Sequence, residues 1–173
     1  ETAGVKYNEF GITVDRNLRT TNKLVYAIGD IVKGSRFTHT ASYHAGIVLK
    51  KILLGLPSKL RTDHIPQVTY TDPEIASVGM NFEDAVKRFG KKIERSCVNL
   101  KNNDRAITDS KTEGFVEVIL LGKKVIGCSI TSKNAGELIS FWAFVIAKNI
   151  KISSINAMIP PYPTLGEINK RVV

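Results

Sequence analysis

The 173-residue sequence is poor in cysteine and lacks the short motifs that most directly indicate redox chemistry. Its two cysteines, Cys97 and Cys128, are too few and too far apart for a disulfide scaffold, a zinc site or a closely spaced redox pair. It contains no G-x-G turn, the feature that lets backbone amides approach a dinucleotide pyrophosphate. The chain therefore lacks parts that a self-sufficient nucleotide-dependent redox enzyme requires.

Long hydrophobic runs are also missing. The longest, around residues 138–150, is interrupted by Ser140, Lys148 and Asn149 and is too short to span a bilayer as a helix. No signal peptide or lipidation motif is visible. Because both cysteines are interpreted as free thiols, these features predict a cytoplasmic protein that does not insert into a membrane.

Acidic residues are scarce relative to basic ones, with 16 Asp and Glu against 25 Lys and Arg and a formal charge of +9. Strongly basic domains often bind phosphate polymers, so a non-catalytic basic binding module is one interpretation. The densest basic stretch holds Lys87, Arg88, Lys91, Lys92, Arg95 and Lys101. Single-strand binders interleave such charges with exposed aromatics, whereas here only Phe89 lies within the stretch, at a helical core position. A solvated basic face is favoured, and no nucleic-acid partner is predicted.

The remaining composition, 43% hydrophobic and 24% charged, is that of a globular protein. Residues 11–15 and 24–28 predict two buried strands of an α/β sheet, and residues 56–66 predict a linker. A helix is predicted between the second strand and the linker. Gly55 and Pro57 are its stop signals, and Thr38 or Thr40 is its N-cap. Its apolar pattern consists of Ala41, Ala45, Val48, Ile52 and Leu53.

The pattern changes after residue 66. A strand at 67–71 precedes a helix that begins after Asn81 as N-cap and ends at Gly90. Further strands are expected at 92–100, 115–121 and 124–131, the last two forming a hairpin through Gly122, followed by a helix at 135–148. This arrangement predicts an α+β domain, an antiparallel sheet with helices packed on it, preceded by the C-terminal strand and helix of an α/β domain.

The helix expected at 135–148 is apolar on almost every side. Such a helix must be covered on more than one face, and one sheet covers only one. Either the tail of the same chain or a second subunit covers the rest. The second alternative is favoured and predicts a homodimer.

Three motifs lie in a fixed order along the chain: Y-A-I-G-D at 26–30, T-D-P-E-I-A-S-V-G at 71–79 and Y-P-T-L-G-E at 162–167. Together they resemble the C-terminal part of the flavin-dependent pyridine nucleotide-disulfide oxidoreductases, in the branch that contains dihydrolipoamide dehydrogenase and mercuric reductase. The resemblance implies that residues 1–60 are the C-terminal portion of an FAD-binding domain. It implies that residues 66–173 are the dimerisation domain.

In such enzymes a hydride passes from NAD(P)H to FAD and on to a cysteine pair, which reduces a small-molecule disulfide or a thiol-bound metal. The resemblance implies that this chain is a fragment that supplies a flavin contact, the dimer interface and the active-site tail. Alone it is expected to bind neither cofactor and to be inactive. A flavoprotein similar to soluble pyridine nucleotide transhydrogenase is the alternative within the family.

Gly29 and Asp30 end an apolar segment, where a carboxylate can accept hydrogen bonds from ligand hydroxyls. By resemblance to the A-x-G-D motif, Asp30 would hold the ribityl chain of FAD. The start of the next helix would direct its positive dipole end at the flavin. The predicted cofactor-binding residues are Gly29, Asp30, Thr38, His39, Thr40 and Ala41.

Tyr162 and Glu167 are the predicted catalytic residues of the tail. The corresponding family pattern is H-P-T-x-x-E, in which the His is an acid/base and the Glu orients it. Here Tyr162 stands at the His position, as Tyr does nearby in mercuric reductases and transhydrogenases. A phenol has a pKa of about 10, and lowering it by three units would require about 4 kcal/mol. The substitution therefore predicts hydrogen-bond donation or positioning of a metal thiolate in place of dithiol acid/base catalysis.

The three histidines do not predict a metal site. His39 and His44 are five residues apart, a spacing that does not put two rings on one helical face, and His64 lies in the linker. Arg105 and Glu137 match positions that are charged in the family and are interpreted as surface or capping residues.

Overall fold

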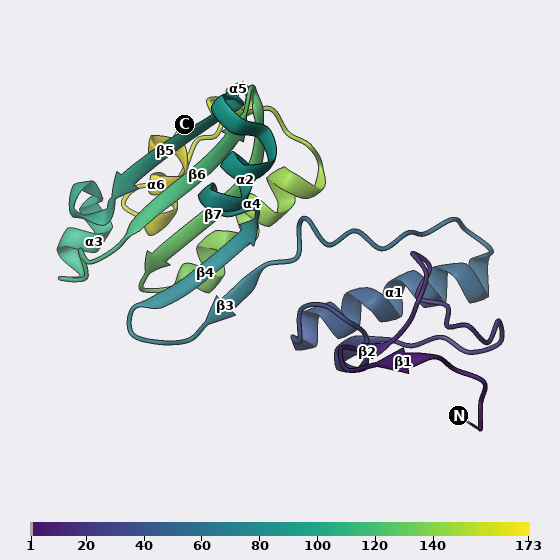
Figure 1. The fold of residues 1–173 in the computed structure, drawn as a ribbon. Helices are drawn as coiled ribbons and strands as arrows, with labels where there is room; N and C mark the ends of the chain where they lie inside the picture. Colours follow the sequence, from purple (N-terminus) through teal and green to yellow (C-terminus); the bar gives the residue numbers. More distant parts are fainter. Residues whose placement is uncertain (1) are drawn as a thin grey trace. The chain divides into compact units, whose positions relative to one another are not determined.

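The structure is a computed structural model and describes residues 2–173. The chain divides into two compact units, one ending at Thr62 and the other spanning Asp63–Val173 (Figure 1). Each unit has its own cluster of buried hydrophobic residues. The two are therefore described separately.

The first unit consists of a short hairpin, a 3₁₀ turn and one long helix. The hairpin pairs β1 (Tyr7–Asn8) with β2 (Gly11–Ile12), η1 covers Gly29–Ile31, and α1 covers Thr38–Leu54. Its core is small and contains Leu18, Ala27, Val32 and Ile47.

The two buried strands predicted here are largely wrong. Only Gly11–Ile12 of the first segment is a strand, and in the second only Tyr26 pairs, in an isolated bridge with Arg19. Residues 18–27 fold back on themselves, because the Thr20 amide donates to the Val25 carbonyl (3.0 Å) and the Ala27 amide donates to the Leu18 carbonyl (3.1 Å). These local bonds satisfy the backbone without a sheet, and Leu24 is left 91% exposed.

The helix α1 and its stop at Gly55 are confirmed, but its predicted cap and buried face are wrong. Phe37 is the N-cap residue, and no side chain caps the helix. The buried stripe is Thr40, His44 and Ile47, spaced one turn apart. Ile52 and Leu53, expected to be buried, are 57% and 71% exposed, because the described chain packs against the opposite face of the helix.

The second unit is built on a five-stranded antiparallel sheet with strand order β3-β4-β7-β6-β5. The predicted strands and the hairpin through Gly122 are confirmed. The strands are β3 (Gln67–Thr69), β4 (Glu74–Gly79), β5 (Ile93–Asn99), β6 (Phe115–Leu121) and β7 (Lys124–Ser132).

The strand β4 was not predicted, since Asp72, Pro73 and Gly79 indicate turns. It nevertheless pairs with β7 along its whole length, from Glu74 opposite Ser132 to Gly79 opposite Gly127. Gly79 has φ of +76°, and a Cβ there would lie 2.3 Å from the carbonyl oxygen of Ile126. Glycine is required at position 79 because the backbone of the adjacent strand β7 passes so close.

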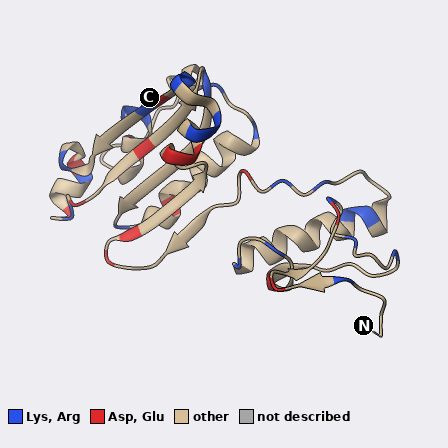
Figure 2. Ribbon diagram, viewed as in Figure 1, with Lys and Arg blue, Asp and Glu red and all other residues tan. Residues whose placement is uncertain are grey.

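Helices cover both faces of the sheet (Figure 1). The helix α2 (Phe82–Phe89) lies on one face, and Asn81 caps it as predicted, its Oδ1 accepting from the Asp84 amide at 2.8 Å. Figure 2 shows acidic residues at the start of α2 and basic ones at its end, the order that complements the helix dipole. Short helical segments complete the unit: η2 (Gly90–Lys92), η3 (Leu100–Asn102), α3 (Asp104–Thr108), α5 (Ile152–Ile155), η4 (Leu165–Glu167) and α6 (Ile168–Arg171).

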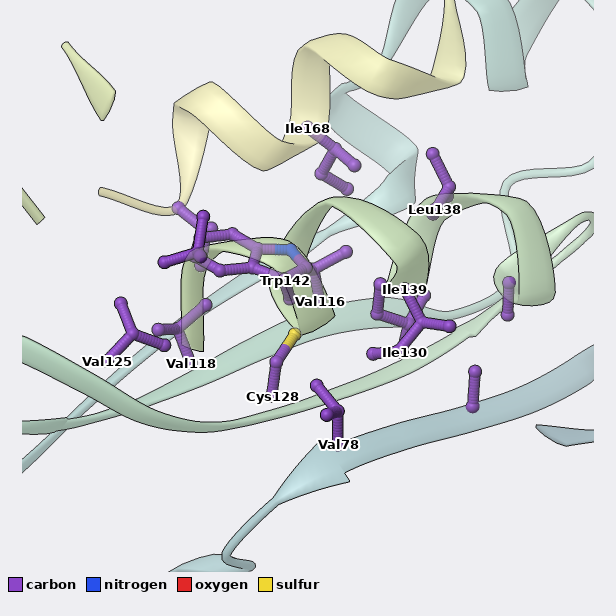
Figure 3. Packing of buried hydrophobic residues seen from close by; sticks show 14 of the residues in the cluster. Val78, Val116, Val118, Val125, Cys128, Ile130, Leu138, Ile139, Trp142 and Ile168 are labelled. Carbon is purple, nitrogen blue, oxygen red and sulfur yellow. The ribbon is translucent and has the colours of Figure 1, made fainter. Parts of the chain in front are cut away.

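The predicted apolar helix is α4 (Ala135–Ala147), and it packs against the other face of the sheet. Its side chains meet those of β6 and β7, while α6 lies against its far side (Figure 3). Trp142 is fully buried, and Ile168 and Val172 of the tail belong to the same core. The chain's own tail thus covers a further side of this helix, whereas Phe144 is left 56% exposed, and the favoured expectation of a second subunit stays a prediction.

Within residues 2–173, no helix combines the length and the apolar character needed to cross a membrane.

Candidate functional site

The predicted cofactor-binding residues lie together in the first unit, around the turn at Gly29. Gly29 is buried and has φ of +70°. A Cβ at this position would lie 3.2 Å from the Cβ of Ala41, so the turn packs directly on the first turn of α1. Asp30 follows on η1 and is exposed. The sequence thus brings a free carboxylate close to a helix N-terminus.

The side chain of His44 holds the Gly29 turn through a hydrogen bond. The Gly29 N–H donates to Nδ1 of His44 at 3.2 Å, and His44 is only 4% exposed. An imidazole that accepts at Nδ1 carries its proton on Nε2 and is neutral. Burial also lowers the pKa of His44, which favours the same neutral form.

The first turn of α1 carries three polar side chains, Thr38, His39 and Thr40. Thr38 is exposed, and the ring of His39 stacks on that of Phe37 with centroids 5.1 Å apart. Thr40 is only 2% exposed, and its Oγ1 is buried without a hydrogen-bond partner. An unpaired buried hydroxyl is destabilising, so this arrangement suits a polar ligand at the helix start.

Tyr162 and Glu167 lie in the tail of the second unit. The Tyr162 side chain is 71% exposed. Its hydroxyl donates a hydrogen bond to the Asp104 carboxylate, and this bond is the main cause that raises the pKa of Tyr162 above its ordinary value. The phenol, whose ordinary pKa is about 10, is thus protonated at neutral pH with its single O–H directed at Asp104.

Asn103, which the sequence reasoning missed, holds the tail against α3. It is fully buried, its Nδ2 donates to the Thr164 carbonyl at 3.1 Å, and its Oδ1 accepts from the Ala106 amide at 3.0 Å. One side chain thus caps α3 and fixes the backbone two residues after Tyr162. The guanidinium of Arg171 adds a second attachment by donating to the Asn102 carbonyl.

Glu167 has only a loose partner. Its Oε1 lies 3.9 Å from Nη2 of Arg171, while its Oε2 is buried without a hydrogen-bond partner. A glutamate that oriented an imidazole would have that ring as its partner. Position 162 of this chain is a tyrosine that interacts with Asp104, so Glu167 has no imidazole to orient there.

A hollow of about 270 Å³ lies beside the tail. Arg105, Glu137 and Thr164 contribute to its walls. Arg105 is paired with Asp109, its Nε lying 2.9 Å from Oδ1, which agrees with its interpretation as a surface residue. Glu137 is exposed in the first turn of α4.

The residues that sequence reasoning missed had recognisable signals. Asn103-Asp104 shortly before apolar Ala106 and Ile107 is a helix-start signature, which the short length of α3 concealed. From the sequence, His44 is considered only as a metal ligand. It nevertheless lies one helical turn after Thr40, the spacing of residues that share one face of a helix. Among residues 2–173, no group of His, Cys, Asp and Glu is placed to hold a metal ion.

Comparison with known proteins identifies relatives of this arrangement. Residues 65–172 match the family described as the dimerisation domain of pyridine nucleotide-disulphide oxidoreductases. The chain is 30% identical over 168 residues to a mercuric reductase of Bacillus cereus, covering 95% of this chain and 26% of that protein. It is 35% identical over 171 residues to a dihydrolipoyl dehydrogenase of Geobacillus stearothermophilus, covering 97% of this chain and 36% of that protein.

Solved structures show the same fold. The crystal structure of LpdA from Mycobacterium tuberculosis superposes with a TM-score of 0.90 at 24% identity, covering 98% of this chain and 37% of that one. The Cu(II) complex of RclA, a flavoprotein disulfide reductase from Escherichia coli, gives 0.87 at 24% identity and covers 39% of its chain. The chain thus spans about a quarter to two fifths of the length of these relatives.

Proposed function

This chain belongs to the pyridine nucleotide-disulphide oxidoreductase family, and from that premise we propose that it is the C-terminal part of an FAD-dependent, NAD(P)H-linked oxidoreductase acting on a disulfide or a thiol-bound metal. The mercuric reductase and dihydrolipoyl dehydrogenase relatives support this class of substrate. We assign residues 1–60 to the FAD-binding domain and residues 66–173 to the dimerisation domain.

The start of α1 and the Gly29 turn fit FAD. Asp30 is free to accept hydrogen bonds from the ribityl hydroxyls, and Thr40 Oγ1 is a buried polar atom in want of a partner. The uncapped N-terminus of α1 favours negative charge beside it. When bound, FAD would supply the two-electron transfer between nicotinamide and the disulfide or metal.

The exposed apolar side chains of α1 support a larger FAD-binding domain. Leu49, Ile52, Leu53 and Leu54 are each more than half exposed in this chain. Soluble proteins rarely leave such a contiguous apolar surface uncovered. In the proposed full-length protein, other parts of the FAD-binding domain cover it.

Tyr162 acts in this proposal as a hydrogen-bond donor and not as a general base. Its ordinary pKa of about 10, raised further by Asp104, keeps the phenol protonated at neutral pH. A protonated phenol can position a thiolate or a metal-bound thiolate if its single O–H turns from Asp104 to that ligand, but it cannot accept a proton from a dithiol. This pair of residues is the observation that distinguishes the tail from one that carries a catalytic imidazole.

We further propose that the protein is a homodimer. The matched family is a dimerisation domain, and the second unit leaves Phe144, Ile159 and Tyr162 between 56% and 91% exposed. Burial of these side chains against a second copy would place the two tails at the subunit boundary.

The full-length protein tests the proposal. We expect one FAD per chain, and oxidation of NADH or NADPH that depends on either a small disulfide such as lipoamide or Hg(II) with excess thiol. A colourless protein that oxidises neither nucleotide with any of these acceptors would overturn the proposal. Steeply salt-dependent binding to single-stranded nucleic acid in such a protein would instead support a basic binding module.

A further inference from the structure

His44 and the Gly29 turn form a contact whose role the proposed reaction does not explain. The two residues are 15 positions apart, and the Gly29 N–H points at Nδ1 of His44 from 3.2 Å. His44 lies within the buried stripe of α1, one turn after Thr40. Two of the three buried residues of this helix are therefore polar, and both lie on the side of the turn.

The backbone of the turn is conformationally demanding. Gly29 has φ of +70°, and the first turn of α1 is so close that a Cβ would lie 3.2 Å from Ala41 Cβ. The segment after it bonds locally, since the Val32 amide donates to the Gly29 carbonyl at 3.0 Å. The carbonyl and the amide of Gly29 are thus both engaged, and the amide depends on His44.

Asp30 is the residue that this contact orients. It follows Gly29 directly and is exposed. The position of its Cα and the direction of its Cα–Cβ bond depend on the backbone of the preceding residue. A defined Gly29 backbone therefore fixes the point from which the Asp30 carboxylate reaches a ligand.

We propose that His44 is a positioning residue for FAD, whose neutral imidazole accepts the Gly29 N–H and thereby holds the Asp30 carboxylate where it meets the ribityl hydroxyls. The proposal rests on the proposed function, because it takes FAD as the ligand of this turn. The proposal requires a hydrogen-bond acceptor at the position of His44 Nδ1, and a side chain that only fills the space is not sufficient.

Three substitutions at His44 distinguish a requirement for a hydrogen-bond acceptor from a requirement for side-chain volume. His44→Asn keeps an oxygen close to the place of Nδ1, whereas His44→Gln carries its amide one bond further out. His44→Leu removes the acceptor and keeps apolar volume. The matched control is His64→Asn, which removes an imidazole from the start of the second unit.

The measurement is FAD affinity of the full-length protein, from the fluorescence of released FAD and from the visible band of the bound flavin. Thermal unfolding without FAD is recorded in parallel. We expect His44→Leu and His44→Gln to bind FAD about fivefold or more weakly, the loss for one hydrogen bond of about 1 kcal/mol. His44→Asn and His64→Asn should stay within about twofold of the wild type, again on that scale.

Two results would overturn the positioning role. One is wild-type affinity and flavin spectrum in both His44→Leu and His44→Gln. The other is an equal loss in His44→Asn and His44→Gln, which would show that the position of the acceptor is irrelevant. If His44→Leu does not fold, the Asn and Gln variants still decide. A wild-type protein that binds no FAD contradicts the proposed function itself, and is distinguishable because every variant would then be alike.

Discussion

The indole Nε1 of Trp142 donates a 2.8 Å hydrogen bond to Oδ1 of Asn169, and both residues are almost completely buried. The bond joins α4, the central helix of the second unit, to α6 in the tail. Because the tail also carries Tyr162 and Glu167, the position of the proposed active-site corner is tied to the core of the domain.

Trp142→Phe is expected to destabilise the second unit by about 1–3 kcal/mol, since it leaves the buried Asn169 amide oxygen without a partner. Chemical denaturation followed by circular dichroism measures the change. The double variant Trp142→Phe/Asn169→Leu should recover part of the loss, because both polar partners are then gone. Unchanged stability in the single variant would mean that the hydrogen bond contributes nothing.

Phe144→Lys is expected to weaken the dimer without unfolding the protein. Phe144 is 56% exposed on α4, whereas its neighbour Val145 is buried, so a lysine at position 144 remains solvated in a monomer. Light scattering across a dilution series measures the dissociation. Val86→Lys, a similar change on α2 where the side chain is 39% exposed, is the control. A dimer as stable as the wild type would exclude Phe144 from the interface.

The sequence predicted the second unit well where local signals agree with tertiary packing. Asn81 and Gly90 bound α2 as expected, and Gly122 closes the predicted hairpin. Side-chain periodicity cannot say which partner covers a helix that is apolar all round. For α4 the tail covers one further side, which the sequence left open, and Phe144 is exposed on another. In the case of β4, turn-forming Asp72 and Pro73 just before it concealed a strand that pairs with both β3 and β7.

The first unit was predicted less well, for a related reason. Apolar periodicity assigns the buried face of α1 to Ile52 and Leu53, but the described chain packs on Thr40 and His44 instead. Hydrophobic periodicity does not detect a buried stripe that contains polar residues. Two of the residues predicted from the motif to bind the cofactor, Gly29 and Ala41, are nevertheless neighbours in space.

Stability of the first unit is expected to fall as the pH drops below about 6.5, the ordinary pKa of histidine. Burial lowers the pKa of His44 in the folded state, so the unfolded chain binds a proton over a pH range in which the folded chain does not. The stabilisation is complete above that range and is lost on acidification. The ring of Tyr43 lies next to that of His44, with centroids 6.2 Å apart, and Asp30 is the acidic residue of η1.

Thermal unfolding between pH 7.5 and pH 5 follows this effect, in wild type and in His44→Asn. The Asn variant cannot titrate and should show a smaller loss over this interval. Identical pH dependence in the two proteins would assign the acid sensitivity to another group.

Glu167→Gln is expected to lower turnover of the full-length enzyme by less than about tenfold, well below the loss on removing an essential acid/base. Its carboxylate has only Arg171 at 3.9 Å and has a second oxygen without a partner. The amide fills the same space and still supports the tail. Steady-state kinetics with lipoamide or Hg(II)-thiol as acceptor measures the effect, and a loss of about a thousandfold would restore Glu167 to a catalytic role.

The pH profile of turnover in the full-length enzyme, compared for wild type, Tyr162→Phe and Tyr162→His, tests the central claim most directly. Because a tyrosine with an ordinary pKa of about 10, raised further by Asp104, stays protonated near neutrality, the wild-type profile should show no ionisation of this residue there. Tyr162→Phe should lose turnover only modestly, and Tyr162→His should introduce an ionisation near the ordinary histidine pKa of about 6.5. A loss of about a thousandfold or more in Tyr162→Phe would contradict the account, because it would make the tyrosine an essential proton-transfer group.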